Sequence, residues 1–74
     1  MTINESVRER ILGLCQEKGI PLNHLAARCG LPPAAVNKVI RADASADINF
    51  IHAVCNGLGL SISSFFAAPI FQKF

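Results

Sequence analysis

The sequence predicts an all-α protein, a single compact domain of five helices that covers residues 1–74. Apolar residues recur three and four positions apart along the chain, and no segment alternates apolar and polar residues as a strand does. Glycine and proline interrupt this pattern at short intervals, which limits each helix to a few turns. No repeat or linker divides the chain, so we expect one bundle around one small core.

Residues 4–18 are predicted to form the first helix. Asn4 is a residue type that caps a helix N-terminus, and Glu5 places a negative charge in the first turn. Gly19, followed by Pro21, ends the segment. The residues expected to form its buried face are Val7, Ile11, Leu14 and Cys15.

Two short helices are predicted next, on either side of a turn at Gly30. The first of them begins at Leu22 and stops at that glycine, which leaves room for about two turns. Pro33 is expected to start the other, over residues 33–41, because the N–H that proline lacks has no helical partner at that position. The residues expected to share the apolar, buried face are Leu22, Leu25, Ala26 and Cys29, then Val36, Val39 and Ile40.

The last two predicted helices each begin at a residue with a strong capping preference. Asp47 is the expected N-cap of the fourth helix, which Gly57 and Gly59 end. Ser61 is expected to cap a fifth helix of one to two turns, closed by Pro69. The apolar residues expected to be buried are Ile48, Ile51, Val54, Cys55 and Leu58, then Ile62, Phe65 and Phe66.

The composition argues against an enzyme, a metal protein or a membrane protein. The three cysteines, Cys15, Cys29 and Cys55, have no close pairing and match no zinc spacing with the two histidines, so we expect them to pack in the core. No serine, cysteine or carboxylate pair suggests catalysis, and we expect no cofactor and no small-molecule ligand. No apolar run reaches the roughly 18–20 residues of a membrane span, and the first residues lack a signal peptide, so we expect a cytoplasmic protein.

Residues 22–41 have the features of a helix-turn-helix motif. Ala26 is small enough to let two helices approach closely, and Gly30 permits the positive φ of a tight turn. Leu31 and Val36 are placed to fill the joint between the helices. The spacing therefore predicts two crossed helices, of which the second is exposed on its outer face.

The chain resembles the Cro and phage-repressor type of helix-turn-helix regulators, the XRE family, over about residues 7–66. The resemblance is carried by "RILGLCQEKGI", "LNHLAARCGL", "AAVNKVI" and "IHAVCNGLGLSISSFF". It implies a lambda-repressor-like fold and a bacterial, sequence-specific transcriptional regulator that binds double-stranded DNA as a homodimer. In that family the third helix enters the major groove, and the start of the second lies against the phosphate backbone.

The resemblance also assigns contact positions. The residues that match base-facing positions are Pro33, Ala34, Ala35, Asn37 and Lys38. The residues that match phosphate contacts are Asn23, His24, Arg28 and Arg41. Between residues 18 and 42 the chain has four Lys or Arg side chains and no Asp or Glu, although its net charge is only +2. This clustering of basic charge favours a polyanionic partner.

Several positions depart from the family pattern. The first turn of the third helix, usually polar, can make only apolar contacts here, for example to a thymine methyl. The start of the second helix carries Pro21 and Leu22 in place of a polar cap and a phosphate-binding side chain. An arginine and glutamate that brace the first and third helices in many relatives are replaced by Cys15 and Ile40, which we expect to touch.

The apolar C-terminal tail, residues 67–74, has two alternative roles. Ile70, Phe71 and Phe74 either fold back over the first and fifth helices or form a two-fold interface with a second copy. Phe50, which lies off the main stripe of the fourth helix, is a further candidate for that dimer interface. A second class of function therefore stays open, a repressor-fold module for protein interaction or dimerisation with little or no DNA binding.

Overall fold

Five α-helices and one 3₁₀ turn make up residues 2–72, the part of the chain that the computed structural model describes. The elements are α1 (Ile3–Lys18), α2 (Leu22–Cys29), α3 (Pro33–Ile40), α4 (Ile48–Leu58), α5 (Ile62–Phe66) and η1 (Pro69–Phe71). No strand occurs within these residues, so the prediction of an all-α bundle is confirmed. The predicted helix ends agree with the observed ones to within a residue or two.

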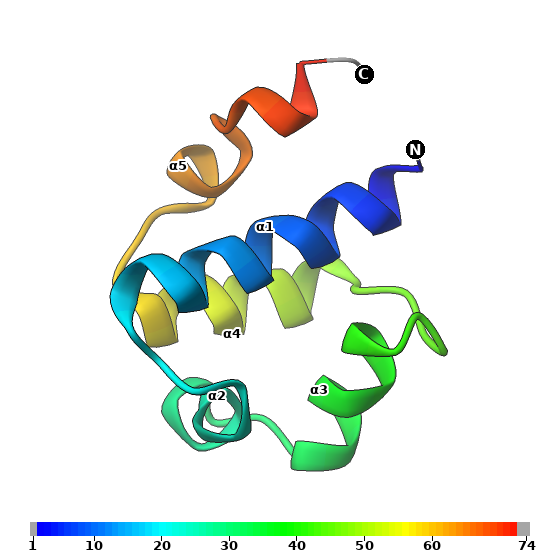
Figure 1. Ribbon diagram of the computed structural model, residues 1–74, viewed down its shortest axis with the longest axis vertical. Coiled ribbons are helices and arrows are strands. Elements are labelled where there is room, and N and C mark those ends of the chain that lie inside the picture. Colours follow the sequence, from blue (N-terminus) through cyan, green and yellow to red (C-terminus); the bar gives the residue numbers. More distant parts are fainter. Residues whose placement is uncertain (1, 73–74) are drawn as a thin grey trace.

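Helix α4 packs against both α2 and α5. Helix α1 packs against α2 and against η1, and α2 packs against α3. As Figure 1 shows, α2 and α3 lie at one end of the molecule, and α5 with η1 lies at the opposite end. Helices α2 and α3 therefore form a separate face of the bundle, which the packing of α2 against α4 holds in place.

The core contains most of the residues expected to be buried, but Leu22 is 37% exposed because it stands at the first position of α2, outside the packed part of the helix. Its largest fully buried side chains include Phe65, Ile11, Leu25 and Val54. Two assignments on α4 are corrected: Ile48 is 59% exposed at the first position of the helix, and Phe50 is only 8% exposed. Phe50 joins the core because α4 has neighbours on two sides, so a wider stripe of that helix is covered. It therefore does not offer the exposed dimer contact that the sequence suggested.

The first helix begins one residue earlier than expected, and its N-cap is Thr2 rather than Asn4. The Thr2 Oγ1 atom accepts from the Glu5 backbone N at 3.2 Å, and Glu5 Oε1 accepts from the Thr2 backbone N at 2.9 Å. This reciprocal capping box, whose T-x-x-E signature is present in the sequence, also lowers the pKa of the Glu5 carboxyl through the backbone hydrogen bond from Thr2. Asn4 instead donates from Nδ2 to Ser45 Oγ at 3.1 Å.

The caps predicted for the last two helices are confirmed. Asp47 Oδ1 accepts from the Phe50 backbone N at 2.8 Å, and Ser61 Oγ accepts from the Ser64 backbone N at 3.0 Å. The end of α4 is corrected, because Gly57 lies within the helix and Gly59, with φ of 73°, is the C-cap. The reason for a glycine at position 57 is packing against α2 rather than chain termination.

The tail folds back on its own chain. The Phe71 ring centroid lies 5.9 Å from that of Phe65 and 4.9 Å from that of Phe66, and η1 packs against α1. Within one chain Phe71 therefore takes the fold-back position, Ile70 is half-buried, and Phe74 lies outside the described residues; the dimer contact stays a prediction. The aromatic cluster extends the small core, which a chain of this length needs.

Arg10 fixes the position of α5, a role that the sequence did not predict. Its Nε and Nη2 atoms donate to the backbone oxygens of Phe65 and Ser64 at 2.9 and 3.0 Å. Its guanidinium also lies 5.9 Å from the centroid of the Phe65 ring. One arginine on α1 thus binds the terminal carbonyl groups of a five-residue helix that has few internal hydrogen bonds.

Cys15 and Ile40, the pair expected to touch, both belong to the apolar interior. Cys15 is buried, and Ile40 packs against the core cluster. Two hydrophobic residues leave no buried charge to be compensated at this position. Their direct contact stays a prediction.

Replacing Ser6 with alanine is expected to raise the free energy of unfolding by about 0.5–1 kcal/mol. The Ser6 hydroxyl is buried, and no hydrogen-bond partner for it lies within residues 2–72. Alanine removes the unsatisfied group and has a higher helix propensity. Urea denaturation measures the change, with Ser45→Ala as the control that should lose stability, since it removes the bond from Asn4. A Ser6→Ala variant less stable than the parent would contradict the assignment.

Replacing Ala42 with glycine is expected to stabilise the protein by roughly 1 kcal/mol. Ala42 has φ of 63°, and it stands after the end of α3 at a position where helices usually carry glycine. The Asp43 and Ala42 amides close the helix by donating to the Lys38 and Val39 oxygens at 2.8 and 3.1 Å. Thermal unfolding tests this, and Ala44→Gly, at a residue with negative φ, should have the opposite sign. Equal effects at the two positions would refute the strain at Ala42.

Candidate nucleic-acid interface

A tight turn at Gly30 joins α2 to α3 and sets the direction of the second helix. Gly30 has φ of 67°, and the Leu31 backbone N donates to the Ala26 oxygen at 2.9 Å. Leu31 is half-buried and packs against the core to which Val36 belongs. The positive φ favours glycine, and the buried side chains after it hold α3 against the bundle by one edge. The opposite edge of α3 stays in contact with solvent.

Four residues form the outward face of α3. Asn37 and Lys38 stand three and four positions after Ala34, and four and three positions before Arg41, which places the four residues on one side of the helix. All of them are exposed. Among residues 2–72 no hydrogen bond or ion pair engages the side chains of Asn37, Lys38 or Arg41. Their donors are therefore free to contact a partner.

The first turn of α3 has very few free hydrogen-bond donors. Pro32 and Pro33 have no N–H, and the Ala35 and Val36 amides both donate to the Pro32 oxygen, at 3.0 and 3.3 Å. The Ala34 amide is the remaining donor of this turn. Pro33 and Ala34 are exposed and Ala35 is half-buried, so the tip of α3 has an apolar surface.

The start of α2 differs from the start of α3, because it has free backbone donors and two exposed polar side chains. Pro21 is its N-cap and supplies no side-chain hydrogen bond, while the His24 amide donates to the Pro21 oxygen at 2.9 Å. The amides of Leu22 and Asn23, at the first two helical positions, have no helical acceptor. Asn23 and His24 are both exposed, as expected of phosphate contacts.

A shallow depression lies beside this helix start, and we name it the α2 depression. Its lining residues are Lys18, Gly19, Ile20, Pro21, His24, Ala27 and Arg28. Three of the seven carry or can acquire positive charge, and none is acidic. Arg28 is held at its edge, because its Nε donates to the Gly57 oxygen on α4 at 3.2 Å. That bond, which the sequence did not predict, restricts Arg28 to the side of α2 that faces the C-terminal end of α4.

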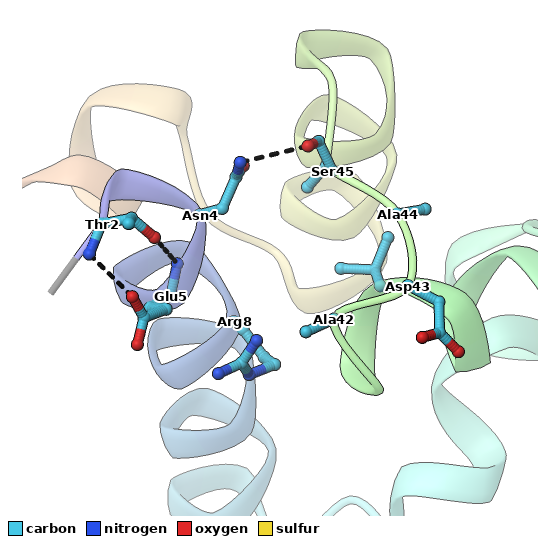
Figure 2. A pocket seen from close by; sticks show the side chains of 10 residues that line it. Thr2, Asn4, Glu5, Arg8, Ala42, Asp43, Ala44 and Ser45 are labelled. Carbon is cyan, nitrogen blue, oxygen red and sulfur yellow. Dashed lines mark hydrogen bonds between the residues drawn. The ribbon is translucent and has the colours of Figure 1, made fainter.

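The loop after α3 bears negative charge, but one of its carboxylates is already used. Asp47 caps α4, and its Oδ1 atom accepts the Phe50 amide. Asp43 is exposed and is, with Arg8, one of the residues that line a cleft between the start of α1 and the loop; its carboxylate points away from Arg8 (Figure 2). The hydrogen bond from Asn4 to Ser45 closes one side of this cleft. Because the cleft contains charges of both signs, it favours neither an anion nor a cation.

The cysteines show no sign of metal or redox chemistry. Cys15 and Cys55 are buried and Cys29 is half-buried. Burial raises the pKa of all three thiols, which keeps them protonated and unreactive at neutral pH. Within residues 2–72 no three His, Cys, Asp or Glu side chains are arranged to hold a metal ion.

A groove between α3 and α4 was not predicted from the sequence. Apolar side chains form most of its wall, and Lys38 and Asp47 stand at its rim. The lining residues are Leu31, Ala35, Lys38, Val39, Ala44, Ser45, Asp47, Asn49 and Phe50. The side chain of Ile48, next to Asp47 in the chain, is 59% exposed and adds apolar surface near this groove.

Comparisons of the chain with protein-family models, curated proteins and solved structures give no match. None of the helices in residues 2–72 combines the length and the apolar character that crossing a bilayer requires. The evidence on function therefore comes from the exposed face of α3, the free amides of α2 and the charges around them.

Proposed function

We propose that this protein is a sequence-specific DNA-binding transcriptional regulator of the XRE type, in which α2 and α3 form a helix-turn-helix. The observation that carries the proposal is the outward face of α3, where Asn37, Lys38 and Arg41 are exposed and have no intramolecular partner within residues 2–72. This face lies in a segment without a single acidic residue between positions 18 and 42. A free, basic helical face held by its other edge suits the major groove of a duplex.

In this proposal α2 contacts the phosphate backbone and α3 contacts the bases. The start of α2 lies against a phosphate, which the free amides of Leu22 and Asn23 and the side chain of His24 contact. Helix α3 enters the major groove, where Asn37 and Lys38 face the bases and Arg41 reaches the backbone. Arg28, held by Gly57, contributes charge at the edge of the α2 depression.

The regulator is proposed to act as a homodimer, because three to five phosphate contacts per monomer give modest affinity at physiological salt. Two copies related by a two-fold axis would bind half-sites about one helical turn apart, roughly 34–36 Å. Phe50 and Phe71 are occupied in the monomer, so Ile70, which is half-buried, is the described tail residue that stays a candidate for the interface. A two-fold contact of this kind would be self-complementary.

A gel-shift assay on a random-sequence duplex library at low salt tests the proposal. Binding is expected, and the logarithm of the affinity should fall with the logarithm of the salt concentration with a slope of about −0.9 per phosphate contacted. Selection from the library then yields the preferred site and the spacing of its half-sites. The absence of any shift at low salt would refute DNA binding.

The groove between α3 and α4 favours a second candidate, a module that binds a protein partner or its own copy. Its apolar wall and the exposed Ile48 are a surface that a buried contact would cover. In that case the apolar tip of α3 marks the loss of base reading. Failure to shift any duplex, together with self-association in a sedimentation concentration series, would favour this candidate over the regulator.

A further inference from the structure

Resting on the proposed function, we infer the chemistry of the half-site that α3 reads. The base facing Ala34 is a pyrimidine with a 5-methyl group, namely thymine or 5-methylcytosine. The base pair facing Asn37 and Lys38, one to two steps away, presents the acceptor edge of a purine. The protein therefore senses a methyl group at one position of each half-site.

The first part of the inference, a methylated pyrimidine opposite Ala34, rests on the few hydrogen-bond donors in the first turn of α3. Within this turn only the Ala34 amide remains free, since two residues are prolines and the Ala35 amide is bonded to the Pro32 oxygen. The exposed side chains are those of Pro33 and Ala34, which are apolar. Such a surface gains most from an apolar partner, and the thymine methyl is the apolar group that a base pair offers in the major groove.

The second part, a purine opposite Asn37 and Lys38, rests on the next turn of the same face of α3. Asn37 and Lys38 stand three and four residues after Ala34, which places them about 4.5–6 Å farther along the helix axis. That distance corresponds to roughly one to two base-pair steps of 3.4 Å each. The Lys38 ammonium donates only, so it suits the N7 and O6 acceptors of guanine, and Asn37 suits the edge of adenine.

The inference is tested on the selected duplex by removing one methyl group at a time. Each thymine is replaced in turn by deoxyuridine, which lacks the methyl group and keeps the same pairing edge. At one position per half-site the affinity is expected to fall about fourfold, the effect of burying one methylene-sized group, and roughly 15-fold when both half-sites are changed. If cytosine occupies that position, 5-methylation should raise the affinity by a similar factor.

The Ala34→Gly variant tests whether the side chain of Ala34 causes the dependence of affinity on the methyl group. The ratio of affinities for the thymine and deoxyuridine duplexes is expected to fall from about four toward one. Because the ratio compares two duplexes with the same protein sample, any loss of helix stability caused by glycine cancels. Asn37→Ala is the matched control, which should lower affinity for both duplexes and leave the ratio near four.

Three outcomes separate the inferred methyl contact from the proposed binding of DNA. A methyl effect that disappears in Ala34→Gly supports the inference. A selected duplex whose affinity changes neither when any thymine is replaced by deoxyuridine nor when any cytosine is 5-methylated overturns it and leaves the regulator proposal standing. A protein that shifts no duplex at low salt overturns both.

Discussion

Replacing Gly57 with alanine is expected to lower the free energy of unfolding by about 1–3 kcal/mol. A Cβ atom at this position would lie 2.5 Å from Cys29 Sγ, 2.8 Å from Cys29 Cα and 2.9 Å from the Arg28 backbone oxygen. Two of these three atoms belong to the backbone of α2 and can move only if the helix moves. The strain therefore exceeds the roughly 1 kcal/mol that alanine gains over glycine inside a helix.

Urea denaturation of Gly57→Ala beside Gly13→Ala separates packing from propensity. Gly13 is an exposed residue of α1, and no atom lies within 4 Å of the position of its Cβ. The second variant should gain about 0.5–1 kcal/mol. Opposite signs are expected, and a stabilised Gly57→Ala variant would show that α2 and α4 do not approach as closely as described.

Replacing Lys38 with glutamine is expected to lower the affinity for the selected duplex about tenfold or more, with little change in stability. Lys38 is exposed on the outward face of α3, and glutamine removes its charge while it keeps a polar side chain of similar reach. In the proposed complex this side chain contacts a base edge in the major groove. Gel shift at fixed salt measures the change.

Ser63→Asp is the matched control for Lys38→Gln, because each variant lowers the net charge by one. Ser63 is exposed on α5, at the opposite end of the molecule from α3 (Figure 1). If DNA approaches the α2–α3 face, the control should bind nearly as well as the parent protein, since exposed charges more than about 10 Å apart are largely screened. Equal losses in the two variants would indicate a general effect of charge rather than a contact by α3.

The helices themselves were predictable because their signals act over a few residues. Asp47 and Ser61 each bind an amide three positions later, so capping depends only on local chain geometry. The exposed face of α3 was predictable for the same reason, since the burial of Val36 and Val39 leaves the other side of a helix free. Where the prediction failed locally, at the N-cap of α1, the T-x-x-E pattern that identifies Thr2 was present in the sequence.

Other features depend on which segments meet, and no local pattern encodes that. Gly57 fits both the end of a helix and a close contact, and only the position of α2 against α4 distinguishes the two. The same contact places Arg28 on the Gly57 oxygen, which limits its reach toward a phosphate. Arg10 resembles any surface arginine until α5 brings its terminal carbonyl groups within hydrogen-bond distance.

By itself the sequence determined where most of the helices begin and end, which residues α3 exposes and how charge is distributed along the chain. These properties follow from hydrogen bonds and side-chain spacing within a few residues. The tertiary structure alone decided that Phe50 is a core residue, that Phe71 covers Phe65 and Phe66, and that the tip of α3 retains a single free amide beside an apolar groove. Burial depends on neighbours distant in the chain, because an apolar side chain is buried only by the segments that pack against it in the folded state.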